Sequence, residues 1–327
     1  MQDRAARIRT GMVPQAATRA KALDTRVSIN LAHLRGLEHQ AKALTFLPRQ
    51  PARSAMNGRH ASRLRGRGLN FEELREYLPS DDVCAIDWKV TARTGRPHVR
   101  VFTEERDRPA LIVVDQRMSM YFGSRLNMKS VTAAECAALV AFRILDQGDR
   151  VGGIVFGDEV IAEIRPKRSR TALNRFLAVL AEANRLLRPD APSIDPVPMN
   201  AVLRAVVRIA PRNHLIIILS DFAEIDETTK KLVTAIARHN DLVLGLVSDP
   251  YADALPRNAQ LAVSDGRLQI AIDTQDGDIH RTVTDLVRGR IATILDWQRA
   301  LGVPVLPLTT AEDSLSQMRR LMGLRPR

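Results

Sequence analysis

Two apolar segments of the chain each end beside an acidic residue. The first runs Leu-Ile-Val-Val into Asp115, and Arg117 and Ser119 follow at two-residue steps. The second, residues 215–219, is followed by a serine and then by Asp221. Buried strands of a parallel sheet read as continuous apolar runs, and ligands bind at the carboxyl edge of such a sheet. We therefore predict that Asp115 and Asp221 lie on neighbouring parallel strands, close enough to share one cation.

The elements that would hold these residues alternate along the C-terminal two thirds of the chain. Such alternation requires crossover connections and predicts an α/β fold, a mostly parallel Rossmann-type sheet with helices on both faces. An Asp-Gly pair at residues 265–266 predicts a hairpin turn. The expected strands are 110–115, 151–156, 160–164, 214–220, 242–247 and 303–308, and the expected helices are 127–146, 170–187, 199–209, 226–239, 278–301 and 311–321.

Three segments are expected in the domain organisation. Residues 1–28 are basic and lack apolar periodicity, which predicts a flexible arm. Residues 29–108 are expected to form an N-terminal helix, residues 29–47, and a small β-rich subdomain. Residues 109–327 are expected to form the α/β domain.

Charge and composition restrict the partners. The 327 residues carry a net charge of +12, which suits nucleic acid, an anionic membrane surface or an acidic protein. Aromatic residues make up only 4%, which disfavours base stacking, so we rank an acidic protein above nucleic acid. Cys84 and Cys136 match no metal or redox spacing. With no signal-like or membrane-spanning apolar run, we expect a cytoplasmic protein, and the basic arm leaves peripheral contact with the inner membrane open.

Short motifs follow one another in a characteristic order along the chain. They are Gly58-Arg59-His60, Arg65-Gly66-Arg67-Gly68, Leu74-Arg75, Pro79-x-Asp81-Asp82, Asp87-Trp88-Lys89, Ala92-Arg93, Ser119-Met120, Gly148-Asp149-Arg150 and Ser220-Asp221-Phe222. This ordered string resembles the bacterial family called domain of unknown function 58, in its short soluble branch, and the resemblance runs from about residue 31 to the C-terminus. That family is von Willebrand factor A-like and is commonly paired with MoxR-type AAA+ ATPases.

The resemblance implies a divalent-ion site, and the chain departs from it at two places. The family site takes an aspartate and two hydroxyls from one loop, a threonine from a second and an aspartate from a third. Asp115, Ser119 and Asp221 match, but Arg117 replaces the first hydroxyl, and no hydroxyl stands near Val197, where the threonine is expected.

Three states of the site remain open. Magnesium prefers six oxygen ligands, and a guanidinium is always charged. We favour Arg117 itself lying between Asp115 and Asp221 in place of the metal. An empty site with Arg117 in solvent and a weak magnesium site are the alternatives, and no other cofactor is expected.

By resemblance, the expected function is that of a non-enzymatic adaptor. It would work with a MoxR-type AAA+ ATPase on a client protein, for example a metalloenzyme such as methanol dehydrogenase, beside whose genes one family branch stands. Asp115, Arg117 and Asp221 would form the partner-facing site, and no small-molecule substrate is expected. A structural role in the cell envelope or in stress stays open. The sequence names neither the client nor the oligomeric state.

An enzyme of another class is the main alternative. Pro79, Asp81, Asp87 and Lys89 are similar in order to the signature of magnesium-dependent nucleases, in which two carboxylates hold the metal. The same residues belong to the family string, where their alternating charges are expected to pair within the small subdomain. The sequence has no phosphate-binding P-loop and no nucleophile elbow. We therefore expect no enzyme activity.

Overall fold

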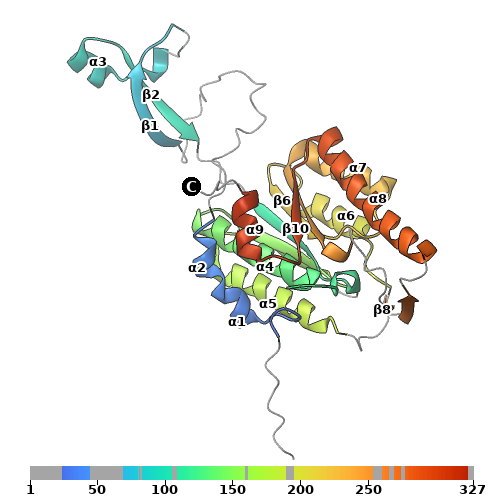
Figure 1. Cartoon of the computed structure of the whole chain (residues 1–327). Helices are drawn as coiled ribbons and strands as arrows, with labels where there is room; N and C mark the ends of the chain where they lie inside the picture. The colour runs from blue at the N-terminus through green and yellow to red at the C-terminus, as the bar shows by residue number, and fades with distance from the viewer. Residues whose placement is uncertain are drawn as a thin grey trace, which may run out of the picture.

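The main body is built on a sheet of six strands (Figure 1). The computed structural model describes residues 24–44, 69–79, 81, 83–104, 109–158, 161–188, 195–252, 260–264, 269–273 and 277–322. The strands of this sheet are β3 (Ala110–Asp115), β4 (Val151–Phe156), β5 (Ile161–Lys167), β6 (Leu215–Ser220), β7 (Asp241–Ser248) and β10 (Val305–Thr309).

The order of the strands identifies where the chain reverses direction across the sheet. In space they run β10-β7-β6-β3-β4-β5, and all neighbours are parallel except the β4–β5 pair. Counted along the chain, the spatial order is 3-2-1-4-5-6, that of doubly wound sheets. The predicted mostly parallel, Rossmann-like α/β fold is confirmed. Its topological switch point lies between β3 and β6.

Helices cover both faces of the sheet. Alternate residues of β3 divide between two apolar cores, with Ile112 and Val114 in one and Leu111 and Val113 in the other. This explains the unbroken apolar run in the sequence, because neither face of β3 meets water. The first core lies under α1 (Leu31–Gly36), α2 (Glu38–Ala41), α4 (Lys129–Asp146), α5 (Arg170–Leu186) and α9 (Ser314–Leu321), and the second under α6 (Met199–Ile209), α7 (Glu227–His239) and α8 (Gly277–Leu301).

The N-terminal helix differs from the prediction, since it is two short helices with a break at Leu37. The Leu37 N–H bonds to the Leu34 carbonyl three residues back, which tightens the turn there. Residues before α1 also bind the body, because the Met128 N–H donates to the Arg26 carbonyl and the Ile29 N–H donates to Asn184 Oδ1, both at 2.9 Å. The last residues of the predicted arm, residues 1–28, thus contact the body, and residues 1–23 lie outside the described residues.

A small unit precedes the main sheet in the chain. It consists of the antiparallel hairpin β1 (Leu69–Glu76) and β2 (His98–Glu104) with η2 (Val83–Ala85) and α3 (Trp88–Thr94). Arg75 pairs with Asp81 through two bonds of 2.7 Å, as expected for this charged block. A second hairpin, β8 (Gln260–Ser264) with β9 (Gln269–Asp273), lies where the Asp-Gly turn predicted one, although the turn itself is outside the described residues. None of the described helices is both long and apolar enough to cross a membrane.

Candidate functional site

Asp115 ends β3, and Ser220 and Asp221 end or follow β6, so all three lie at the switch point of the sheet. Val114 of β3 lies opposite Leu219 of β6 in a parallel register, so the residues that follow reach the same sheet edge. The three side chains are buried. Ser220 Oγ donates to Asp115 Oδ2 at 2.6 Å and accepts a bond from the Phe222 N–H. The expectation that these two aspartates lie on neighbouring parallel strands is confirmed.

Arg117 is folded back onto Asp115 inside the protein. Its Nε lies 3.1 Å from Asp115 Oδ1, its Nη2 lies 2.8 Å from Oδ2, and its backbone N–H also donates to Oδ1 at 3.0 Å. The guanidinium carbon lies 5.4 Å from the centre of the Phe156 ring. Burial opposes the charge of the arginine, but Asp115, with smaller contributions from Asp221 and Glu224, outweighs it and raises the Arg117 pKa. A fixed cation therefore stands against Asp115.

Asp221 takes a different cation. Lys129, the first residue of α4, donates to Asp221 Oδ2 at 2.6 Å, and the Ala223 N–H donates to Oδ1 at 3.0 Å. Burial acts to raise the pKa of the Asp221 carboxyl, but the charges of Lys129 and Arg290 together with these bonds hold it below its usual value. The hypothesis that Arg117 lies between both aspartates is therefore wrong for Asp221, which pairs with Lys129 while Arg117 pairs with Asp115.

Lys129 was missed by sequence reasoning, although one signal was present. A positive charge at a helix N-terminus opposes the helix dipole, so a lysine there indicates a compensating carboxylate nearby. The distance of 92 residues between Lys129 and Asp221 hid the partner.

Two more positions of the metal site implied by the resemblance are Val197, where a threonine is expected, and Ser119. The first contacts Arg117 and the second does not reach the buried charges. The loop before α6 reaches Arg117 through the backbone, since Arg117 Nη1 donates to the Val197 carbonyl at 3.4 Å. Ser119 lies in the short helix η3 (Met118–Met120), and its side chain is exposed. The Met118 N–H donates to the Asp158 carboxylate, which attaches this loop to the end of β4. Asp115, Arg117 and Asp221 thus come together, while Ser119 stands apart.

These residues do not fit a divalent ion. Arg117 and Ser220 donate to the oxygens of Asp115, and Lys129 and the Ala223 N–H donate to those of Asp221. A guanidinium and an ammonium thus take the bonding positions that a magnesium ion would need. Within the described ranges, no three His, Cys, Asp or Glu residues are grouped as metal ligands would be.

The surface around the buried charges is partly apolar. Phe122 and Leu126, on the loop between η3 and α4, are exposed, and this loop is held by a bond from the Lys129 N–H to the Phe122 carbonyl at 2.7 Å. Glu224, on the loop after β6, has a backbone φ of 60° and a side chain that is 64% exposed. Its carboxylate lies 4.0 Å from Arg117 Nη1. We call Phe122, Leu126 and Glu224 the rim of the site.

Asp249 forms a second buried polar cluster at the end of β7. It accepts bonds from the backbone N–H and the hydroxyl of Ser124, at 2.8 and 2.6 Å, and from the hydroxyl of Thr310. Burial acts to raise the pKa of the Asp249 carboxyl, and these bonds lower it overall. The cluster joins the loop that carries Phe122 and Leu126 to the ends of β7 and β10.

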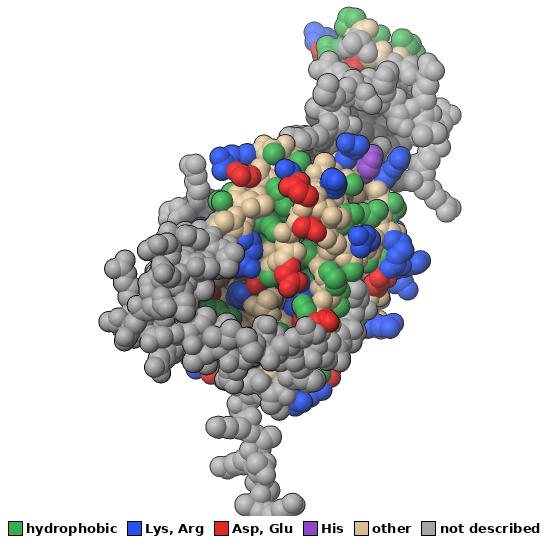
Figure 2. Space-filling model, turned by 90° about the vertical axis from the view of Figure 1, so that its right-hand side faces the viewer, with side chains coloured by type: hydrophobic (Ala, Val, Ile, Leu, Met, Phe, Trp, Pro, Cys, Tyr) green, Lys and Arg blue, Asp and Glu red, His purple; other side chains and the backbone are tan. Residues whose placement is uncertain are grey.

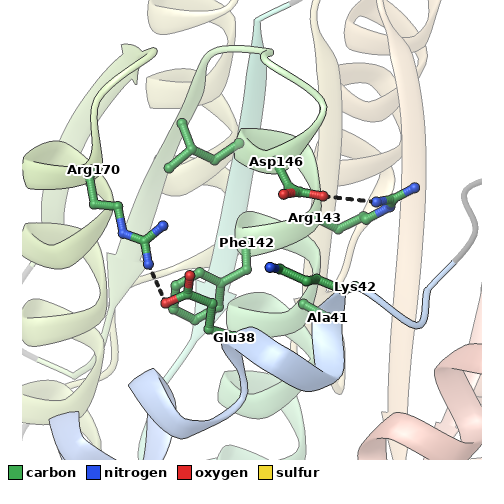
Figure 3. Close-up of a pocket in the computed structure, with 8 residues that line it drawn as sticks. Glu38, Ala41, Lys42, Phe142, Arg143, Asp146 and Arg170 are labelled. Carbon is green, nitrogen blue, oxygen red and sulfur yellow. Dashed lines mark hydrogen bonds and ion pairs between the residues drawn. The ribbon is translucent and has the colours of Figure 1, made fainter.

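A pocket of about 280 Å³ lies between α2, α4 and α5 (Figure 3). Its arginines are matched by carboxylates, since Arg170 pairs with Glu38, and Arg143 pairs with Asp146 at 3.1 Å. Lys42 points into the space (Figure 3). The pocket is small and its two arginines are neutralised by carboxylates. We therefore interpret it as part of the packing interface between α2 and the body.

The acidic residues of the nuclease alternative serve local structure. Asp81 pairs with Arg75, and Asp87 caps α3 by accepting from the backbone N–H of Lys89 and Val90 at 3.0 and 3.2 Å. Each carboxylate therefore has a partner that explains its presence, and this speaks against a paired-carboxylate metal centre here.

The order of the strands defines a Rossmann-like α/β protein. At the switch point of its sheet, the side chains of Arg117 and Lys129 supply positive charges to the two buried aspartates. The chain belongs to the family described as protein of unknown function DUF58, whose model matches residues 73–291. It is 27% identical over 290 residues to the uncharacterized protein Rv1480 of Mycobacterium tuberculosis and to the uncharacterized protein Mb1516 of Mycobacterium bovis. These alignments cover 88% of this chain and 89% of the relatives.

A solved structure with partial similarity is that of proximal thread matrix protein 1 from the mussel byssus. The match has a TM-score of 0.35 and 10% identity, and it covers 66% of this chain and 45% of that chain.

Proposed function

We propose that this protein is a non-enzymatic adaptor that binds a protein partner at the switch point of its sheet. The observation that carries the proposal is the buried pair of Arg117 and Asp115 at the position where ligands bind doubly wound sheets. The proposed partner is a MoxR-type AAA+ ATPase, by resemblance, and the proposed client is a protein such as a metalloenzyme.

An adaptor role is supported by the way the buried charges are satisfied. Asp115 and Asp221 already accept bonds from Arg117, Lys129 and Ser220, so neither carboxylate is available as a general base. Catalysis at this edge would have to break a buried ion pair first, which is costly.

The geometry changes the role proposed for Arg117. Its side chain is only 2% exposed, so an acidic side chain from a partner does not reach it without displacing Glu224. We propose that Arg117 positions the rim at Glu224, whose carboxylate lies 4.0 Å from Arg117 Nη1. The same nitrogen donates to the Val197 carbonyl and so fixes the loop before α6. Phe122 and Leu126 then supply the apolar contact, which is the usual source of affinity at protein interfaces.

The test is binding of the purified chain to the MoxR-type ATPase of the same organism. Replacing Phe122 and Leu126 together by alanine should weaken binding at least tenfold, equivalent to about 1.4 kcal/mol. Val207→Ala is the matched control, because Val207 is an exposed apolar residue near the end of α6, and α6 ends beside Asn240 and the start of β6, at the opposite edge of the sheet. All variants should keep the wild-type melting temperature.

Chelation tests the same proposal independently. Because the site residues do not fit a divalent ion, EDTA should leave binding unchanged, and titration with magnesium should give little heat. Binding that collapses in EDTA, or that ignores the loss of Phe122 and Leu126, would refute the proposed site.

A further inference from the structure

The small unit exposes large apolar side chains. Trp88 is 66% exposed, Val83 56% and Leu78 51%, and all three lie within eleven positions of one another. Described hydrophobic side chains gather at the end of this unit beside charged ones, at the top of the space-filling view (Figure 2). Exposed large apolar residues that cluster in this way mark interaction sites more often than chance exposure does.

Helix α3 has no packing role that would explain Trp88. None of its seven residues is buried, and it is stabilised at its start by the Asp87 side chain and at its end by Gly95 in the left-handed conformation. The helix is attached to β2 through Thr91, whose Oγ1 accepts a bond from the His98 N–H at 3.1 Å, and the β1–β2 ladder and the Arg75–Asp81 pair hold the rest of the unit. The indole ring is thus available to a partner.

Two positively charged side chains, Lys89 and Arg93, lie on the same helix as Trp88. Lys89 and Arg93 are one helical turn apart and exposed, and within the part of the chain that the structure describes neither forms an ion pair. Arg96, by contrast, pairs with Glu76 at 3.0 Å. The alternating charges of this block therefore do not all satisfy one another.

We propose that Trp88, Lys89 and Arg93, together with Leu78 and Val83, form a docking surface, the α3 face, for an acidic amphipathic segment of another protein. The segment would cover the indole ring with apolar side chains and place carboxylates against the two cations. Tryptophan and arginine are the residues most enriched at energetic centres of protein interfaces. Electrostatic attachment to a membrane takes clusters of about four to eight cations, and α3 offers two, so a protein fits this surface better than a lipid surface. The inference does not depend on the function proposed for the sheet edge.

The experiment uses the full chain and a fluorescein-labelled peptide of about twenty residues, with glutamate and leucine at helical spacing. Anisotropy should show saturable binding that weakens with salt. Trp88→Ala and the double variant Lys89→Glu/Arg93→Glu should each weaken it at least tenfold. The control Lys230→Glu/Lys231→Glu removes two exposed lysines on α7 and should change affinity less than twofold.

Tryptophan fluorescence locates the bound peptide. The chain has two tryptophans, and Trp297 is only 3% exposed, so quenching by iodide reports Trp88. An unlabelled peptide should reduce that quenching and shift the emission to shorter wavelength. Circular dichroism of the variants should match the wild type, because the changed side chains are exposed.

Three outcomes would overturn the proposal. The first is an absence of peptide binding. The second is an equal loss in the α7 control, which would indicate general attraction to the basic chain. The third is protection of Trp88 from iodide by vesicles of phosphatidylglycerol and phosphatidylcholine but not by the peptide, which would assign the α3 face to a membrane.

Discussion

Replacing Arg117 with methionine should destabilise the α/β body strongly. The change keeps a long apolar side chain beside Phe156 but leaves the fully buried Asp115 without its cation. Removing one partner of a buried ion pair costs about 3–5 kcal/mol, because the remaining charge is uncompensated. The Ser220 hydroxyl and the backbone N–H of residue 117 continue to donate to that carboxylate, but neither carries a positive charge.

The loss should appear in thermal and urea unfolding followed by circular dichroism. For a body of this size, 1 kcal/mol corresponds to about 2–4 °C, so the melting temperature should fall by roughly 6–20 °C. The double variant Asp115→Asn/Arg117→Met should recover most of the stability, because both charges are removed together. Arg212→Met is the control, since Arg212 is exposed, and should cost less than about 0.5 kcal/mol.

Two results would contradict this account. One is a free energy of unfolding for Arg117→Met within about 1 kcal/mol of wild type. That result would mean that Asp115 is not left as an uncompensated buried charge when Arg117 is removed. The other is a double variant as unstable as the single one, which would assign the effect to lost packing and not to charge.

Three further predictions concern the other buried polar groups. Lys129→Met should lower the free energy of unfolding most above the ordinary aspartate pKa of 3.8, and its effect should fade as the pH falls through the lowered pKa of folded Asp221, where protonation removes the charge that Lys129 stabilises; urea unfolding across pH tests this. Thr310→Val should cost about 1–3 kcal/mol in the same assay by leaving Asp249 short of a donor, and Thr234→Val, on the exposed side of α7, should not. His33 accepts or donates a bond with Glu135 at 2.7 Å, and this bond raises the His33 pKa. Its stabilisation should be complete below pH 6.5 and lost as the pH rises through the raised pKa, so the melting temperature of His33→Gln should approach that of wild type at alkaline pH.

Much of the fold could be read from local pattern. The apolar run into Asp115 predicted β3 with its bounds, and the spacing of residues 199–209 predicted α6 with its bounds. Both signals are local, because a strand buried on two faces needs an unbroken apolar run and a surface helix needs a stripe at 3.6-residue spacing. The alternation of such elements was enough to predict a mostly parallel sheet and to bring Asp115 and Asp221 to one edge.

The partners of the charged residues depended on the tertiary structure. Of the two aspartates, Arg117 bonds only to Asp115, because the loop after β3 turns back on itself, and Lys129 reaches Asp221 because α4 begins at the same sheet edge. The exposure of Trp88 was equally hidden, since a tryptophan among alternating charges reads the same whether it is covered or free. Charge pairing and exposure depend on distances of a few ångströms between segments far apart in the chain, and a sequence pattern carries residue spacing but not those distances.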